Sequence, residues 1–143
     1  MSPELDDLLD EVRLLWHVAV QATERLHDGE AVTVGMRAVL EFLARNGPRS
    51  VPDIARSRLV TRQHIQSLVN GLLELRLVSL EDNPAHRRSS LVQLAPEGER
   101  TIERMKRRER RFLGGLRLRA DRDELRRAVA TLGAVRSALG GSP

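Results

Sequence analysis

A polar turn between two short apolar runs carries the most distinctive charged residues of the chain. Asn83 and Pro84 open this turn, and His86, Arg87 and Arg88 follow them. Asn-Pro is a turn signal, and a guanidinium keeps its charge and donates several hydrogen bonds in a fixed plane. Such groups suit phosphate and the narrow minor groove of DNA. The pattern therefore predicts an exposed turn that contacts a polyanion.

A second polar group is predicted on a helix from Arg62 to Leu75. At 100° per residue its apolar side chains fall on one face. The opposite face carries amides and a hydroxyl: Gln63, Gln66, Ser67 and Asn70. Gln and Asn can form two hydrogen bonds with adenine in the major groove, and Arg62 at the helix start suits a phosphate or a guanine. A face that is merely solvated is the alternative, although such faces usually carry Glu and Lys.

Groups for catalysis or metal binding do not form a recognisable site. The chain has no cysteine, which excludes disulfides, thiolate catalysis and zinc sites that need sulfur. Asp6, Asp7, Asp10 and Glu11 lie at helical spacing without a histidine, so a solvated acidic face is preferred to a metal site. No phosphate-binding glycine loop, nucleophile elbow or zinc-protease motif occurs. We predict that the protein is not an enzyme and has no metal or cofactor.

Charge and composition narrow the class of partner. The 143 residues carry a net charge of +4, but residues 1–31 are acidic and residues 45–143 are basic. With two Phe, one Trp and no Tyr, an aromatic platform for single-stranded nucleic acid is not expected. The acidic N-terminus and the lack of a long apolar run predict a cytoplasmic protein without a membrane segment. The basic cluster from Arg104 to Arg111 is expected to be partly neutralised by the acidic first helix of the same or the partner chain and otherwise solvated, with a nucleic-acid patch as the alternative.

The elements that position these residues are predicted to be mainly helical. The first helix has an apolar seam at alternating spacings of three and four, formed by Leu5, Leu8, Val12, Leu15, Ala19, Ala22 and Leu26. This seam predicts a helix-helix or dimer interface, with an ordinary amphipathic surface helix as the alternative. Thr33 can cap a second helix that stops at Asn46, and Ser50 can cap a third that ends near Arg58.

The middle of the chain is predicted to form a winged helix-turn-helix. Thr61 can cap the helix from Arg62, and the short turn at Leu59 and Val60 joins it to the preceding helix. Two β-prone runs, residues 77–80 and 90–94, flank the basic turn and predict a hairpin, the wing. A long helix then starts at Pro96 and weakens at Gly114-Gly115, and Asp121 opens a last helix. The expected fold is mainly α with a small β-hairpin.

With its elements in this order, the sequence resembles the MarR/SlyA family of bacterial transcription regulators. The most specific likeness is the wing pattern Asp-Pro-x-Asp-Arg-Arg, a strand, and Leu-Thr-x-x-Gly. Here it reads Asn83-Pro-Ala-His-Arg-Arg88 and Leu94-Ala-Pro-Glu-Gly98. Several positions depart from the family pattern: among them, His86 replaces an Asp that braces the wing arginine, Ala95 a capping Thr, Arg76 a common Gly and Leu80 a frequent Arg.

The resemblance implies one MarR-like domain over residues 1–143. Residues 1–31 and 97–143 would be dimerisation helices, and residues 33–94 a winged helix-turn-helix lobe that binds DNA. Arg88 aligns with the wing arginine that enters the minor groove, and Arg87 would contact phosphate. The predicted DNA-binding residues are Ser50, Thr61, Arg62, Gln63, Gln66, Ser67, Asn70, His86, Arg87 and Arg88. Trp16 and His17 lie near the family's site for small aromatic or phenolic effectors, with a core or interface role as the alternative.

The expected function is that of a ligand-responsive repressor that binds a palindromic operator on double-stranded DNA as a homodimer. Two other functions stay open on the sequence alone. One is a winged-helix protein-interaction module that has lost DNA binding, which the departures at Arg76, His86 and Ala95 allow. The other is an architectural protein that binds DNA without regard to sequence.

Overall fold

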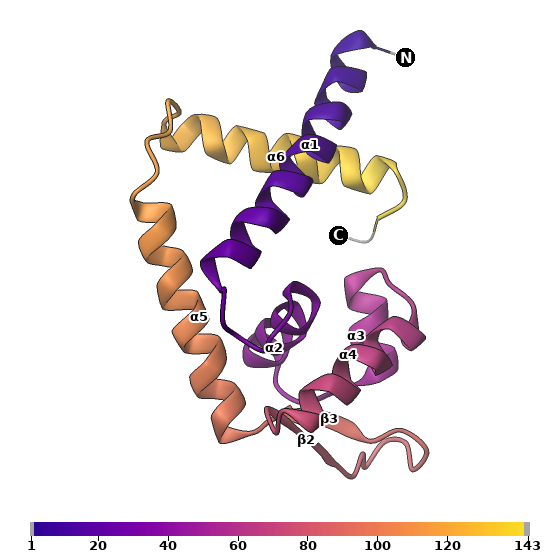
Figure 1. Ribbon diagram of the computed structural model, residues 1–143. Coiled ribbons are helices and arrows are strands. Elements are labelled where there is room, and N and C mark those ends of the chain that lie inside the picture. The colour runs from indigo at the N-terminus through magenta and orange to yellow at the C-terminus, as the bar shows by residue number, and fades with distance from the viewer. Residues whose placement is uncertain (1, 142–143) are drawn as a thin grey trace. The chain divides into compact units, whose positions relative to one another are not determined.

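The computed structural model describes residues 2–141, and within them the chain is mainly helical with a small antiparallel sheet. The elements are α1 (Pro3–Leu26), α2 (Val34–Asn46), β1 (Arg49–Ser50), α3 (Val51–Arg58), α4 (Arg62–Glu74), β2 (Val78–Glu81), β3 (Leu91–Leu94), α5 (Pro96–Gly114) and α6 (Arg122–Ala138). The chain divides into two compact units, one ending at Arg111 and the other beginning at Phe112. The predicted fold class is confirmed, and Figure 1 shows the elements.

Local capping explains where the helices of the first unit begin. The hydroxyls of Thr33, Ser50 and Thr61 each accept a hydrogen bond from the backbone amide three residues later, at 3.2, 3.3 and 3.1 Å. These bonds satisfy amides that the first turn leaves without a helical partner. In the second unit, Asp121 and Glu124 form a reciprocal capping box at the start of α6. All four predicted caps are confirmed.

The sheet has one strand more than the sequence predicted. β2 and β3 form the expected hairpin, with Leu80 opposite Val92, and β1 pairs with the other edge of β3, so that the strand order is β1-β3-β2. β1 contains only two residues, which is too short to show the period of two that identifies a strand. Its pairing ties the start of α3 to the base of the wing.

The hydrophobic core lies in the first unit. It joins α2, α3, α4, the sheet and the first half of α5, and its most deeply buried side chains are Val39, Leu40, Ile54, Ile65, Val69, Leu72, Val92 and Met105. Within the described residues, neither α1 nor α6 contains a buried residue. The core therefore fixes the helix-turn-helix and the wing, and it leaves the apolar side chains of α1 outside.

α4 ends in a left-handed residue, as the departure at Arg76 suggested. Arg76 has φ 59°, its amide donates to the Leu73 carbonyl at 3.0 Å, and the Leu77 amide donates to the Leu72 carbonyl at 3.0 Å. Together these bonds form a Schellman motif, in which the left-handed position favours glycine. Leu72 and Leu77 are both buried, so the motif also turns the chain from α4 into β2.

We expect Arg76→Gly to raise the free energy of unfolding by about 0.5–1 kcal/mol. Glycine removes the steric cost of the left-handed backbone, and the greater entropy of the unfolded chain offsets only part of the gain. The Arg76 side chain is exposed, so little packing is lost. Urea unfolding of the variant and the parent would measure the difference, and an unchanged or lower midpoint would contradict the expectation.

Candidate nucleic-acid interface

The exposed face of α4 carries the predicted polar side chains. Ile65 and Val69 are buried in the core, which orients the helix. Gln63, Gln66, Ser67 and Asn70 are exposed on the other side, and Arg62 is exposed at the start of α4. The Gln66 Nε2 donates to the Asn70 Oδ1 at 2.9 Å. The predicted orientation of this helix is therefore confirmed.

The tip of the wing is an ordered turn. The Asn83 side-chain oxygen accepts from the Ala85 amide at 3.0 Å, and the Asn83 carbonyl accepts from the His86 amide at 3.2 Å. His86, Arg87 and Arg88 are exposed. Within the described part of the chain, neither of these arginines has an acidic partner within ion-pair distance, whereas several arginines elsewhere do. The wing thus presents two guanidinium groups that a polyanion can pair with.

A groove between α4, the start of α3 and the wing brings these two features together. Its volume is about 510 Å³, and it is lined by Val51, Pro52, Arg62, Gln63, Gln66, Leu80, Arg88, Ser89, Ser90 and Val92. Arg62 and Arg88 are 26 positions apart in sequence, yet they border the same concave surface. A surface that carries both amides and guanidinium groups can bind both the bases and the backbone of DNA.

Comparisons with known proteins agree with this geometry. A family model described as the MarR family matches residues 37–89. A crystallised MarR family transcription regulator is 28% identical, with a TM-score of 0.82 over 96% of this chain and 93% of its own. The chain belongs to the MarR family. The MarR match covers most of α2, the helix-turn-helix, β2 and the turn of the wing as far as Ser89, and it includes all the lining residues of the groove except Ser90 and Val92.

Two further comparisons place this MarR chain among its relatives. An uncharacterised protein of Mycobacterium tuberculosis is 36% identical over 96 residues, which are 61% of this chain and 66% of the relative. The chain thus spans slightly less than two thirds of that relative's length. The structure of Bordetella bronchiseptica BpsR, described for the regulation of its DNA binding by 6-hydroxynicotinic acid, has a TM-score of 0.76 at 20% identity, over 93% of each chain. At that identity the likeness shows the MarR fold alone.

One predicted DNA contact of the MarR lobe is corrected by the structure. Ser50 is only 4% exposed, and its hydroxyl caps α3 by accepting from the Asp53 amide. The backbone of Ser50 also pairs with Leu91 in the sheet. Ser50 therefore stabilises the base of the interface and does not reach its surface. Thr61 also caps a helix, but it remains exposed beside Arg62.

The predicted effector residues of the MarR chain lie in the middle of α1. Trp16 is 65% exposed and His17 is also exposed. A hollow of about 220 Å³ lies further along, at the end of α1, where Thr23, His27, Glu30, Arg37 and Met105 are among its lining residues. Trp16 and His17 do not line it. Their role in ligand binding stays a prediction.

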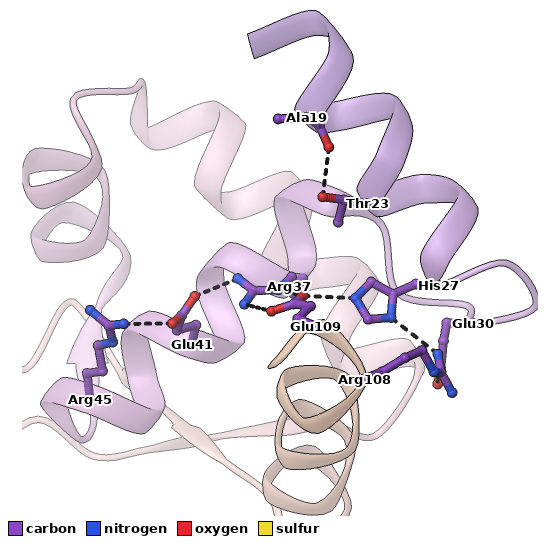
Figure 2. Close-up of polar contacts among 9 residues, drawn as sticks. All are labelled: Ala19, Thr23, His27, Glu30, Arg37, Glu41, Arg45, Arg108 and Glu109. Carbon is purple, nitrogen blue, oxygen red and sulfur yellow. Dashed lines mark hydrogen bonds and ion pairs between the residues drawn. The ribbon is translucent and has the colours of Figure 1, made fainter. Parts of the chain in front are cut away.

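An ion-pair network that sequence reasoning missed connects α1, α2 and α5 in this MarR chain (Figure 2). The Glu109 carboxylate accepts from Arg37 Nε and Nη2 at 2.5 Å each, and it lies 2.8 Å from His27 Nε2. Arg37 also donates to Glu41 at 2.5 Å. His27 is buried, and its Nδ1 lies 3.2 Å from Arg108 Nη1. Arg37 and Glu41 are four positions apart on α2, but the partners on different elements are 72–82 positions apart, so no local spacing in the sequence indicates them.

The network shifts the acidity of its carboxyl groups. Burial raises the pKa of Glu109, but the hydrogen bonds from Arg37 and His27 and the charge of Arg37 outweigh burial, so that this pKa lies below its ordinary value. The pKa of Glu41 is lowered in the same way, with burial opposed by Arg37 and then by Arg45. Both carboxylates therefore stay ionised at neutral pH. Arg37 of α2 pairs with Glu41 on its own helix and with Glu109 on α5.

Within the described residues, the basic cluster of α5 is partly neutralised, by Glu30 and Glu103 and not by the first helix of the same chain. Neutralisation by the first helix of a partner chain stays a prediction. Arg104 and Arg108 reach Glu30 at 3.1 and 3.6 Å, and Arg110 reaches Glu103 at 3.0 Å. Glu30 lies in the loop after α1, and Glu103 lies on α5 itself. In the part of the chain that the structure describes, the carboxylates in the first turns of α1 form no ion pair with these arginines.

No helix of the described chain is long and apolar enough to cross a membrane.

Proposed function

We propose that the protein is a homodimeric transcription regulator that binds specific sequences of double-stranded DNA. The groove that joins Arg62, Gln63 and Gln66 to Arg88 is the observation that carries this proposal. α4 would lie in the major groove with its amides against base edges. The wing would then reach the flanking minor groove, where Arg88 gains from the strong negative potential and Arg87 pairs with phosphate.

The exposed apolar face of α1 supports a dimer. Val12, Leu15 and Trp16 are 37%, 58% and 65% exposed. In the second unit, Val129 of α6 and Leu139, which follows α6, are more than 70% exposed. Monomeric proteins rarely leave such apolar surface in water, so a second copy of the chain is the partner we propose for these helices. Two-fold symmetry would then place two copies of α4 on a palindromic operator.

The proposal also includes control of DNA binding by a small ligand. BpsR has the same fold, and its DNA binding is described as regulated by 6-hydroxynicotinic acid. We propose that this chain is a repressor released by a small aromatic or phenolic effector that Trp16 and His17 contact. Such a ligand would favour a spacing of the two α4 helices that no longer matches the DNA. Titration of the DNA complex with salicylate and related acids tests this, and a lack of mutual effect on either affinity contradicts it.

Selection from a pool of random duplexes tests the main proposal. The full chain should enrich a palindrome, bind it as a dimer by light scattering, and lose affinity steeply between two salt concentrations. The enriched duplex and a scrambled one are then compared by fluorescence anisotropy. Equal binding to both would favour the architectural protein. Absent binding at low salt would favour the protein-interaction module.

We expect Arg88→Ala to weaken binding to the enriched duplex by about 1–3 kcal/mol and to reduce any preference for a narrow minor groove. Arg62→Ala is the matched comparison, because Arg62 borders the same groove from α4. If Arg62 contacts phosphate, its loss should weaken all duplexes alike and flatten the salt slope by about one unit. Anisotropy titrations at several salt concentrations measure both. An unchanged affinity of Arg88→Ala for the enriched duplex would contradict the proposed wing contact.

A further inference from the structure

We propose that Gln66 and Asn70 act as one unit that reads a single adenine in each half-site. The inference rests on the proposed function and adds to it the base that this part of α4 recognises. The two side chains are one helical turn apart, both are exposed, and the Gln66 Nε2 donates to the Asn70 Oδ1 at 2.9 Å. The amides are therefore paired before any DNA arrives, and less side-chain freedom is lost on binding.

The pairing decides what the two amides can offer to a base. Their mutual hydrogen bond uses one amino hydrogen and one carbonyl oxygen. The Gln66 Oε1 and the amino group of Asn70 then remain free. If both amides turned over, Asn70 would supply the free carbonyl and Gln66 the free amino group. In either orientation the pair presents an acceptor beside a donor.

An acceptor beside a donor matches the major-groove edge of adenine. Adenine alone has both a donor, N6, and an acceptor, N7, on the edge of one base. Guanine presents two acceptors, cytosine one donor, and thymine one acceptor and a methyl group. The free carbonyl oxygen of the pair therefore finds no hydrogen-bond donor on guanine or thymine. The free amino group finds no acceptor on cytosine.

Charged residues lie at both ends of the strip of α4 that carries Gln66 and Asn70. At steps of four residues the strip runs Arg62, Gln66, Asn70 and Glu74, all exposed. Arg62 can pair with a phosphate, and Gln66 lines the groove shared with the wing. Glu74 is an anion that phosphates repel. Arg62, Gln66 and Asn70 would therefore face the DNA. The pair of Gln66 and Asn70 lies between the positive charge of Arg62 and the negative charge of Glu74.

A double-mutant cycle on the enriched duplex tests the pair as a unit. Gln66→Ala and Asn70→Ala should each weaken binding about tenfold and remove the preference at the same A·T pair, and the double variant should be little weaker than either single one. The control cycle combines Gln63→Ala with Asn70→Ala. Gln63 is exposed on the same helix but is not paired with Asn70, so those two losses should multiply.

A change of base preference gives a second, independent readout. In Gln66→Glu the carboxylate accepts from the Asn70 amino group, which leaves oxygen atoms facing the base. The preferred base should then change from adenine to cytosine, whose N4 is a donor. Repeating the selection with this variant measures the change. Thermal unfolding checks that each exposed substitution leaves the fold intact.

The outcomes separate this inference from the proposed function. If the parent selects a palindrome but the two alanine variants lose preference at different base pairs, or their losses multiply, the pair is not a unit and the regulator proposal still stands. An enriched guanine at the contacted position would overturn the adenine assignment in the same way. If the parent selects no sequence at all, the proposed function and this inference both fail.

Discussion

Gly98→Ala is expected to lower the free energy of unfolding by about 3 kcal/mol or more. A Cβ at Gly98 would lie 1.9 Å from the Leu77 carbonyl oxygen and 2.9 Å from its carbon. Both atoms belong to the backbone, and the same oxygen accepts from the Ala95 amide at 3.0 Å. The start of α5 would have to move away from the start of β2, and that junction would lose its close packing. Urea unfolding measures the loss.

Gly71→Ala is the matched control. A Cβ there would lie 2.3 Å from the Met36 Cε, which is the end of a flexible side chain. Met36 can rotate away, and alanine favours the helix by about 1 kcal/mol over glycine. The change in unfolding free energy should therefore stay within about 1 kcal/mol. Equal losses in the two variants would show that backbone contact is not what makes Gly98 indispensable.

The Gly98 contact illustrates what the sequence could and could not predict. Gly98 occupies the glycine position of the wing pattern, so the sequence indicated its place but not its reason. The helix starts at Thr33, Ser50, Thr61 and Asp121 were predictable because a cap depends on residues three positions apart. The hydroxyl of Ser50 was likewise foreseen as a cap. The burial of Ser50 was not foreseen, because Ser50 lies in a strand of two residues that is too short to recognise in the sequence.

The candidate interface was predictable to a similar extent. Helical periodicity alone placed Gln63, Gln66 and Asn70 on the exposed face of α4. The groove that brings Arg88 together with Gln63 and Gln66 depends on the direction of the hairpin, which the pairing of Leu80 with Val92 sets. Local patterns cannot supply that pairing across an irregular turn. The ion-pair network of Glu109 could not be predicted for the same reason, because its partners Arg37 and His27 are far from it in the sequence.

Glu109→Gln is expected to lower the free energy of unfolding at pH 7 by about 2 kcal/mol. The glutamine keeps the size of the side chain but loses the charge that faces Arg37, whose side chain is only 16% exposed. An ion pair broken from one side leaves the other charge poorly compensated, although Glu41 still holds part of it. Glu97→Gln is the control on the same helix, because its partner Arg100 is 66% exposed and the pair is screened by water.

The difference between Glu109→Gln and the parent should depend on pH in one direction. The pKa of Glu109 is lower in the folded chain than its ordinary value of 4.5, so ionisation favours folding. That contribution is fully present above the pKa of the unfolded chain, and it is lost as the pH falls through the lower pKa of the folded chain. Urea unfolding at pH 7, 5 and 3.5 should therefore show the two curves converging at the acid end. A constant gap at all three pH values would contradict the assignment of the difference to the ionisation of Glu109.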